Sequence, residues 1–483
     1  MEHSQLIELI RTLTTSEIEQ MRQFTSNSFF NNGKMKDQVI LLLEICLSFS
    51  WDNVEQKLEK KDVFTSIFLN QPFVDGKLEK VMVEAHKVVR AFFLVQRYFR
   101  EENEFHQILD FAEEVRSRGL VSRYHKLIDK VQRLQEESVH SAQYFHRQFL
   151  LQYSKCDEES IRNQAKGDLN IHNTIEALEL DYYHNRLVLL NQLLLQKKIT
   201  NLDLPDVINP LLEENQVPAR HLEKSASIKI NQEIFNLLKK KYPSPPEVQS
   251  LFDLLQLYEK ELDEKSLHEF YTYLRNLCVL TISADYEQTE MENMLHKLYK
   301  DNLERGFLHY KGKINRSRYW ALAINALNVK EFDWALNFIN RYKHEIREEN
   351  ETQDIYRLNL ANYLFRTGDF LACLDNIPST TPFVDYLMVG KRLELKALYE
   401  LHYDLLPYKL DAFKMFLSRT SQKLLSDEQR QMNSDFVNLL HQLINSNPGD
   451  PKRSELLIKR IQEKKQSAEW RWLIEKAKAL RSK

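Results

Sequence analysis

Glycine is scarce in this chain, and its scarcity limits the fold. Only 9 of the 483 residues are glycine, about 2%, whereas glycine usually makes up about 7% of a protein. Tight β-hairpin turns and glycine-rich ligand loops need residues that tolerate a positive φ, which glycine adopts most readily. Leu, Glu, Lys, Gln and Arg, which are good helix formers, are abundant instead. The composition therefore predicts an all-α protein.

The sequence also lacks closely spaced cysteines, long apolar runs and a large excess of one charge. The four cysteines lie far apart, at Cys46, Cys156, Cys278 and Cys373. A disulfide-stabilised secreted domain would carry more of them. No run approaches the roughly 18 uncharged apolar residues of a membrane span, and the first residues lack the pattern of a signal peptide. With 67 Lys and Arg against 70 Asp and Glu, the net charge favours neither nucleic acid nor an anionic membrane. We expect a cytoplasmic protein.

Residues 1–102 are predicted to form an N-terminal helical domain that caps the rest of the chain. Thr14 and Glu17 have the spacing of a capping box, so a helix should begin near Thr15. Asp75 is placed to cap a long helix whose apolar residues recur at intervals of three and four, on one face. These residues are Leu78, Val81, Met82, Ala85, Val88, Val89 and Phe92. Further helices are expected over 36–48 and 62–68.

Residues 103–245 are predicted to form a middle region of long, charged, amphipathic helices. Apolar residues with the spacing of a packed helix seam are Leu180, Tyr183, Leu187, Leu190 and Leu194. Six of the twelve prolines fall between residues 200 and 250, where they should end helices. Ser244-Pro245-Pro246 is the best candidate for a joint, although 219–241 has the pattern of a helix.

Residues 246–483 contain an internal repeat. The apolar positions of residues 322–339 match those of 360–377 at an offset of 38, and turn residues 328–331 correspond to 366–369. A helix, a tight turn and a second helix with small residues at their crossing resemble the tetratricopeptide repeat, whose period is 34. Such a hairpin can bury its apolar face only against a neighbour. We therefore predict a tetratricopeptide-like solenoid of α-α hairpins that ends in a capping helix.

Several sequence stretches together carry a family resemblance. They include Leu13-Thr14-Thr15-Ser16-Glu17, Ser28-Phe29-Phe30-Asn31, Val63-Phe64 with Ile67-Phe68, Lys77-Leu78 with Phe92-Phe93-Leu94, and Ala177-Leu178-Glu179-Leu180-Asp181-Tyr182-Tyr183. Together these resemble an uncharacterised family of long all-helical proteins from Bacteroidota. The resemblance implies an N-terminal helical cap and a C-terminal body of tetratricopeptide-like repeats, with no assigned activity.

Motifs for catalysis or metal binding are not found in the sequence. It has no His-Glu-x-x-His, no Gly-x-Ser-x-Gly and no Cys-x-x-Cys. His140 and His146 are six residues apart, which places them on different faces of a helix. Cys278 and Cys373 lie among apolar residues, which should raise their thiol pKa and reduce their reactivity. We therefore expect no enzyme, cofactor or metal site.

The best local candidate for a partner-binding surface combines positive charge with aromatic rings. Its residues are Tyr310, Lys311, Lys313, Arg316 and Arg318. Arg and aromatic side chains are common anchors in interfaces. The more ordinary interpretation is that the neighbouring Tyr319 and Trp320 belong to the core and that the basic residues form a solvated turn.

A second candidate surface is the basic segment 452–483, with eleven Lys and Arg against four Glu. It contains Trp470 and Trp472. The segment could bind an acidic partner or a nucleic-acid backbone. The alternative, which we favour, is a helix that covers the last repeat and is held by the two tryptophans.

The leading functional hypothesis is a non-enzymatic scaffold that binds another protein or a peptide on the surface of its helical repeats. The alternative is a transcription regulator with a helical-repeat sensor body. Its N-terminal helix-turn-helix-like unit would consist of the short helix over 63–68 and the following helix over 78–92. The sequence does not favour it, because Glu79 and Glu84 interrupt the basic residues of the second helix and a recognition helix needs base-reading and phosphate contacts. We therefore expect a protein or peptide partner, and neither nucleic acid nor a membrane.

Overall fold

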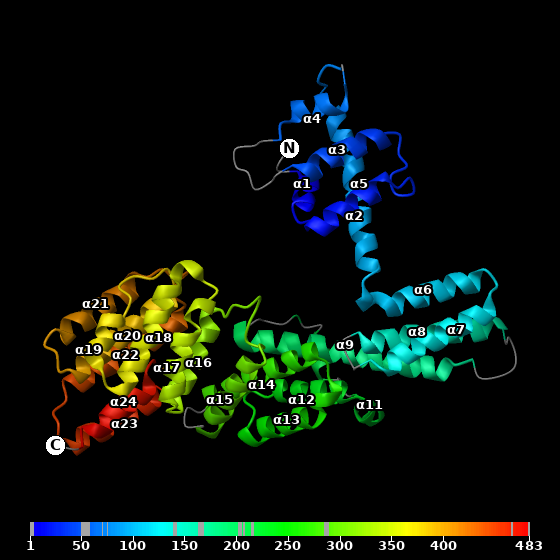
Figure 1. Ribbon diagram of the computed structural model, residues 1–483. Coiled ribbons are helices and arrows are strands. Elements are labelled where there is room, and N and C mark those ends of the chain that lie inside the picture. The colour runs from blue at the N-terminus through cyan, green and yellow to red at the C-terminus, as the bar shows by residue number, and fades with distance from the viewer. Residues whose placement is uncertain are drawn as a thin grey trace. The chain divides into compact units, whose positions relative to one another are not determined.

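The computed structural model describes residues 4–49, 58–69, 71–74, 76–138, 143–162, 169–200, 205, 208–213, 217–284, 289–464 and 467–481. Within these residues the chain has 24 α-helices, no β-strand and two isolated β-bridges (Figure 1). The all-α prediction is confirmed. The chain divides into two compact units, Met1–Ser138 with Gln143–Glu179 and Leu180–Lys483 with Val139–Ala142. The domain boundaries near residues 102 and 245 stay predictions.

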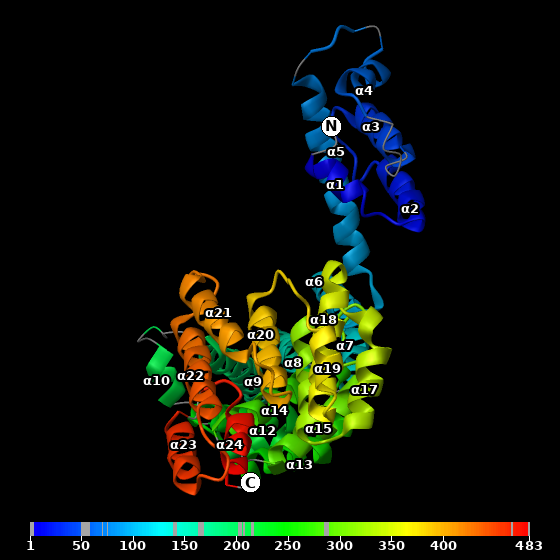
Figure 2. The ribbon, with the colours of Figure 1, turned by 90° about the vertical axis from the view of Figure 1, so that its left-hand side faces the viewer.

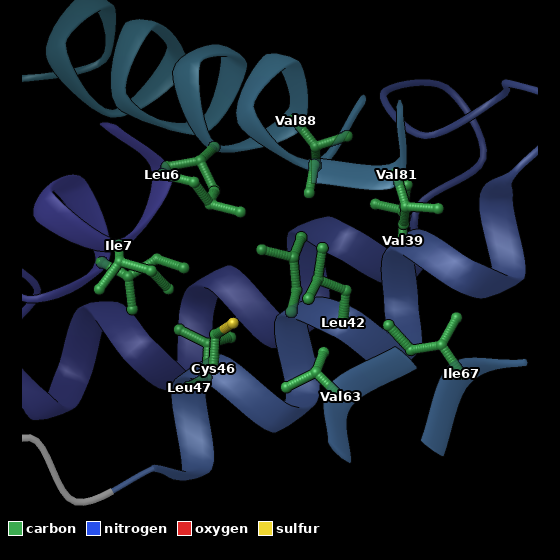
Figure 3. Packing of buried hydrophobic residues seen from close by; sticks show 14 of the residues in the cluster. Leu6, Ile7, Val39, Leu42, Cys46, Leu47, Val63, Ile67, Val81 and Val88 are labelled. Atoms are coloured by element: carbon green, nitrogen blue, oxygen red, sulfur yellow. The ribbon is translucent and has the colours of Figure 1, made fainter. Parts of the chain in front are cut away.

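The first unit opens with five helices around one apolar core. They are α1 (Gln5–Ile10), α2 (Thr15–Ser26), α3 (Lys36–Ser48), α4 (Lys60–Ile67) and α5 (Lys77–Tyr98). Figure 3 shows Ile7 of α1, Leu42 of α3 and Val63 of α4 inside this core, facing Val88 of α5. Each is at most 4% exposed. Burying such a side chain contributes about 1.5–3 kcal/mol, so packing rather than helix propensity stabilises helices as short as α1.

Local signals explain where these helices begin. The Thr14 hydroxyl oxygen accepts from the Glu17 backbone N–H at 3.3 Å, and the Glu17 carboxylate accepts from the Thr14 backbone N–H at 2.8 Å. The predicted capping box is therefore confirmed, as is the helix over 36–48. Gly76, with a φ of +80°, precedes α5. The predicted cap Asp75 lies outside the described residues.

Four more helices belong wholly or partly to the first unit. They are α6 (Glu104–Ser117), α7 (Val121–Glu136), α8 (Tyr144–Arg162) and residues 171–179 of α9 (Ile171–Thr200). Phe105 and Leu109 of α6 pack with Tyr124 of α7 and Leu151 of α8. The Tyr124 hydroxyl donates to the Ser154 carbonyl at 2.9 Å, so this buried polar group is satisfied.

The second unit continues with residues 180–200 of α9. Its next helices are α10 (Asn209–Glu213), α11 (Ala219–Lys224), α12 (Ala226–Lys239), α13 (Pro245–Tyr258), α14 (Glu264–Ala284) and α15 (Thr289–Glu304). One continuous helix over 219–241 is wrong, because Ser225 is extended and caps α12 by accepting from the Ile228 N–H at 3.2 Å. The predicted joint at Ser244 is the capped beginning of α13.

The remaining helices of the second unit follow one another as contacting neighbours. They are α16 (Arg316–Asn328), α17 (Phe332–Arg341), α18 (Thr352–Thr367), α19 (Phe370–Asn376), α20 (Val384–Glu400), α21 (Leu406–Arg419), α22 (Asp427–Ile444), α23 (Pro451–Glu463) and α24 (Trp470–Ala479). Each helix from α16 to α23 contacts the next one in the chain. Figure 2 shows α18, α19 and α20 side by side.

The same backbone turn follows α16, α18 and α20. Lys330, Gly368 and His402 have φ values of 66°, 89° and 51°. The residue after each one donates its backbone N–H to a carbonyl five residues earlier. These bonds are Glu331 to Ala326 at 2.9 Å, Asp369 to Leu364 at 2.9 Å, and Tyr403 to Leu398 at 3.0 Å. This arrangement is a common way to end a helix. The predicted turns at 328–331 and 366–369 thus separate helices.

Gly368 and His402, two members of this set, should respond in opposite ways when glycine is removed from one and introduced at the other. Gly368→Ala should destabilise the second unit by about 1 kcal/mol, because a side chain at a φ of +89° is strained. An added Cβ meets nothing within 4 Å, so the loss comes from the backbone alone. His402→Gly should cause no loss or a small gain. Urea unfolding midpoints measure both, and equal losses in the two variants would contradict this explanation.

Candidate functional site

Three of the five predicted site residues lie in one tight turn between α15 and α16. Tyr310 and Lys313 exchange two backbone hydrogen bonds, of 2.8 and 3.1 Å, across Lys311 and Gly312. Both central residues have a positive φ, of 51° and 73°, which is the geometry of a type I′ turn. Tyr310 is 63% exposed, while Lys313 forms an ion pair with Glu349 at 3.3 Å.

The two predicted arginines contact other parts of the same unit. Arg316 pairs with Asp385 at 2.6 Å, and its guanidinium lies 4.0 Å from the centre of the Phe383 ring. Arg318 donates to the Leu308 carbonyl at 3.0 Å and is half-buried. These contacts join α16 to its neighbours. The structure therefore places Arg316 and Arg318 in intramolecular contacts, and a binding role for the five residues stays a prediction.

The aromatic neighbours of these arginines belong to the packing of α16. Tyr319 is fully buried and its hydroxyl donates to the Ile339 carbonyl at 2.6 Å. Trp320 is half-buried, with its ring centre 5.6 Å from that of Tyr386. Tyr319 therefore lies in the core, as the second interpretation of this region requires.

The second unit also contains a groove with a volume of about 730 Å³. Its lining comes from α14 to α20, α22 and α24, from the turns after α16 and α18, and from residues 467–469 before α24. Its apolar lining residues are Ile282, Ile324, Leu327, Phe332, Phe365, Phe370, Met432, Trp470 and Trp472. This volume lies within the range of about 300–1,000 Å³ that is typical of ligand sites. Below, "the groove" means this space.

The inner wall of the groove holds a buried charge cluster. Glu469, which precedes α24, accepts from Arg392 at 3.1 Å and from Lys396 at 2.5 Å, both on α20. The Lys396 side chain is only 6% exposed. Burial alone would raise the pKa of Glu469, but the two cations hold it at about 2. Glu469 therefore stays ionised, and its negative charge partly offsets two cations that would be costly to bury alone.

Two further ion pairs fasten α24 across the groove. Arg471 pairs with Glu292 of α15 at 2.7 Å, and the Glu292 side chain is 7% exposed. Glu400 of α20 accepts from Lys476 at 2.7 Å and from the indole N–H of Trp472 at 2.8 Å. The segment 469–476 thus contacts helices from far earlier in the chain. These contacts fit the interpretation of the basic C-terminal segment as a covering helix.

A second hollow, of about 530 Å³, shares part of this wall. Its lining includes Arg392 and Met432 of the groove, together with Arg316. Arg316 is the one predicted site residue that lines either space. The exposed Leu424 also lines this hollow.

Possible metal ligands and cysteine thiols were the remaining candidates for chemistry. No three His, Cys, Asp or Glu residues among the described residues are placed to hold a metal ion. Burial raises the pKa of the Cys46, Cys278 and Cys373 thiols to about 12, as the apolar context of Cys278 and Cys373 predicts. His140 lies outside the described residues.

Of the groove lining, only the part in the basic segment 452–483, with Trp470 and Trp472, stood out in the sequence. The other lining residues were missed as a site because they are dispersed from position 282 onward. One local signal was available. Lys396 follows Leu393 and Leu395 and precedes Ala397 and Leu398, so a lysine stands among residues that become buried. A lysine in such a stretch is rarely fully buried unless it is paired.

Comparison with protein-family models, curated proteins and solved structures gives no match for this chain. Among the described residues, no helix has the length and apolar character needed to cross a bilayer.

Proposed function

We propose that this protein is a non-enzymatic interaction scaffold that binds a segment of another protein in the groove. The observation that carries the proposal is the groove itself, which combines an apolar lining with charged walls. Interfaces of this kind bury apolar anchors and use polar groups for orientation. A cytoplasmic location, expected from the sequence, forms part of the proposal.

We also propose that the helices from α16 onward form a tetratricopeptide-like array. Two features support this: each of these helices contacts the next, and the same turn recurs at Lys330, Gly368 and His402, spaced by 38 and 34 residues. Hairpins stacked in this way curve and offer an extended inner surface to a peptide or a helix.

Site-specific cross-linking tests the scaffold proposal. A photoreactive phenylalanine analogue replaces Phe370, which lines the groove, in the full chain expressed in its native host. The control position is Tyr408 of α21, which is 74% exposed and lies outside the groove. We expect a discrete protein adduct at position 370 and none at 408. Identical adducts at both positions, or no adduct at 370, would contradict the proposal.

The alternative hypothesis, a transcription regulator, gains no specific support from the first unit. The apolar stripe of α5 packs into the core. Lys60 pairs with Glu79 at 2.6 Å, and Lys87 pairs with Glu84 at 2.7 Å. A helix that reads DNA needs free basic and polar side chains on one face. A salt-dependent gel shift with the full chain tests this alternative.

A further inference from the structure

The charges that line the groove are unequal in number. Its lining includes six cationic residues and four carboxylates. The cations are Lys330, Arg366, Arg392, Lys396, Arg471 and Lys476, and the carboxylates are Glu292, Glu400, Glu469 and Glu475. The groove therefore carries an excess of two positive charges, although the whole chain has a net charge of −3.

The excess can be assigned to two particular residues. Arg471 pairs with Glu292. Arg392 and Lys396 share Glu469, which leaves one positive charge, and Lys476 pairs with both Glu400 and Glu475, which leaves one negative charge. These two remainders cancel. Lys330 and Arg366 remain, and neither forms an ion pair with another described residue.

Lys330 and Arg366 lie at the ends of successive helices. Lys330 is in the turn after α16, and Arg366 is in the last turn of α18. The Arg366 guanidinium donates to the side-chain carbonyl of Asn328, the last residue of α16, at 3.0 Å. This bond holds the arginine beside the turn that carries Lys330. Both cations are exposed to solvent.

Apolar rings border this pair of cations. Phe332 follows the turn that carries Lys330, and Phe365 precedes Arg366. Phe365 and Phe370 lie with ring centres 5.5 Å apart, and all three rings line the groove. Ser467 also lines the groove, and its hydroxyl has no hydrogen-bond partner among the described residues. The groove lining thus contains two exposed cations, an aromatic surface and a buried hydroxyl without a partner among the described residues.

We infer that the groove binds an acidic peptide segment, in which two nearby carboxylates pair with Lys330 and Arg366 and an adjacent bulky apolar side chain contacts Phe332, Phe365 and Phe370. Two carboxylates neutralise the excess charge, and charge-assisted hydrogen bonds from Arg and Lys are the strong ones. A nucleic-acid strand fits less well, because it carries a phosphate at every nucleotide and only two cations of the lining lack a carboxylate partner in the described part of the chain. The inference rests on the proposed scaffold function and specifies its partner.

Peptide selection on the purified full chain tests this inference. A random twelve-residue phage library is selected against the wild-type chain, and enriched peptides are synthesised with a fluorescent label. We expect two Asp or Glu residues next to an aromatic or aliphatic residue in the enriched set. Binding, followed by fluorescence anisotropy, should weaken about tenfold or more in Lys330→Glu/Arg366→Glu, since two attractions become repulsions.

The matched control reverses two exposed charges outside the groove, in Lys414→Glu/Lys452→Glu. Its net charge equals that of the first variant, and its affinity should stay within about twofold of the wild type. Peptides that cross-link at position 370 but show no acidic enrichment would overturn the inference and leave the scaffold proposal intact. If the selection yields no peptide that cross-links at position 370, both fail.

Discussion

Replacing Glu469 with Gln should lower the free energy of unfolding of the second unit by about 3–5 kcal/mol. The substitution removes the one negative charge that pairs with Lys396 and Arg392, and the Lys396 side chain is only 6% exposed. A buried cation without its carboxylate loses the interaction that offset its desolvation. Urea unfolding followed by tryptophan fluorescence measures the loss.

Two further variants test whether the loss comes from the buried charge of Glu469. One removes an exposed carboxylate elsewhere, and the other removes Glu469 together with its backbone strain. Glu455→Gln removes an exposed carboxylate, 3.6 Å from Arg481, and should change stability little. Glu469→Gly also removes the carboxylate but relieves the strain of a φ of +57°. The free energy of unfolding of Glu469→Gly should therefore be lower than that of the wild type but higher than that of Glu469→Gln. A Glu469→Gln chain within about 1 kcal/mol of the wild type would contradict a stabilising role for the cluster.

The contribution of Glu469 should also depend on pH. Its pKa is about 2 in the folded chain, against an ordinary value of 4.5. A lowered folded-state pKa means that the unfolded chain binds more protons, so the stabilisation is complete above about pH 4.5 and is lost as the pH falls toward 2. The difference in stability between wild type and Glu469→Gln should therefore shrink across this interval.

Asn302→Leu should destabilise the second unit by about 2–3 kcal/mol. Arg275 of α14 is 6% exposed, and its guanidinium donates to the side-chain carbonyl of Asn302 and, at 2.8 Å, to the Thr272 hydroxyl. It forms no ion pair with a described carboxylate. Burial lowers the pKa of this arginine to about 10. Without Asn302, a buried charge loses one of its two side-chain acceptors.

A double-mutant cycle distinguishes this explanation from a simple packing defect. Arg275→Met removes the charge, and in that background Asn302→Leu should cost much less than in the wild type. The unfolding free energies of the four chains give the coupling energy. Additive losses would show that Asn302 acts through its own packing and not through Arg275.

Features set by neighbouring residues were predictable from the sequence. The capping box at Thr14 and Glu17, the helix over 36–48 and the turns around Lys330 and Gly368 each depend on residues within one or two helical turns. The apolar stripe of α5 was visible for the same reason, since a fixed period places its residues on one face. The break at Ser225 was missed because helical residues continue on both sides of it and only the serine signals a new cap.

The candidate groove could not be predicted in the same way. Its pairing of Glu292 with Arg471 joins residues 179 positions apart, and no local pattern relates them. The positive φ of Glu469 is equally hidden, because glutamate rarely adopts this conformation. Sequence reasoning instead selected the dense local cluster around Arg316, whose charges are largely used inside the molecule.

The contacts made by residues 469–476 have a consequence for the order of events during synthesis. Lys396 and Glu292 leave the ribosome long before their partners Glu469 and Arg471. Until these partners emerge, the charges of Lys396 and Glu292 lack the ion pairs that they form in the folded chain and must stay hydrated. The inner wall can therefore close only after residue 476 has emerged. We expect a nascent chain that stops short of it to expose the phenylalanines of the groove, which is the kind of surface that chaperones and proteases bind.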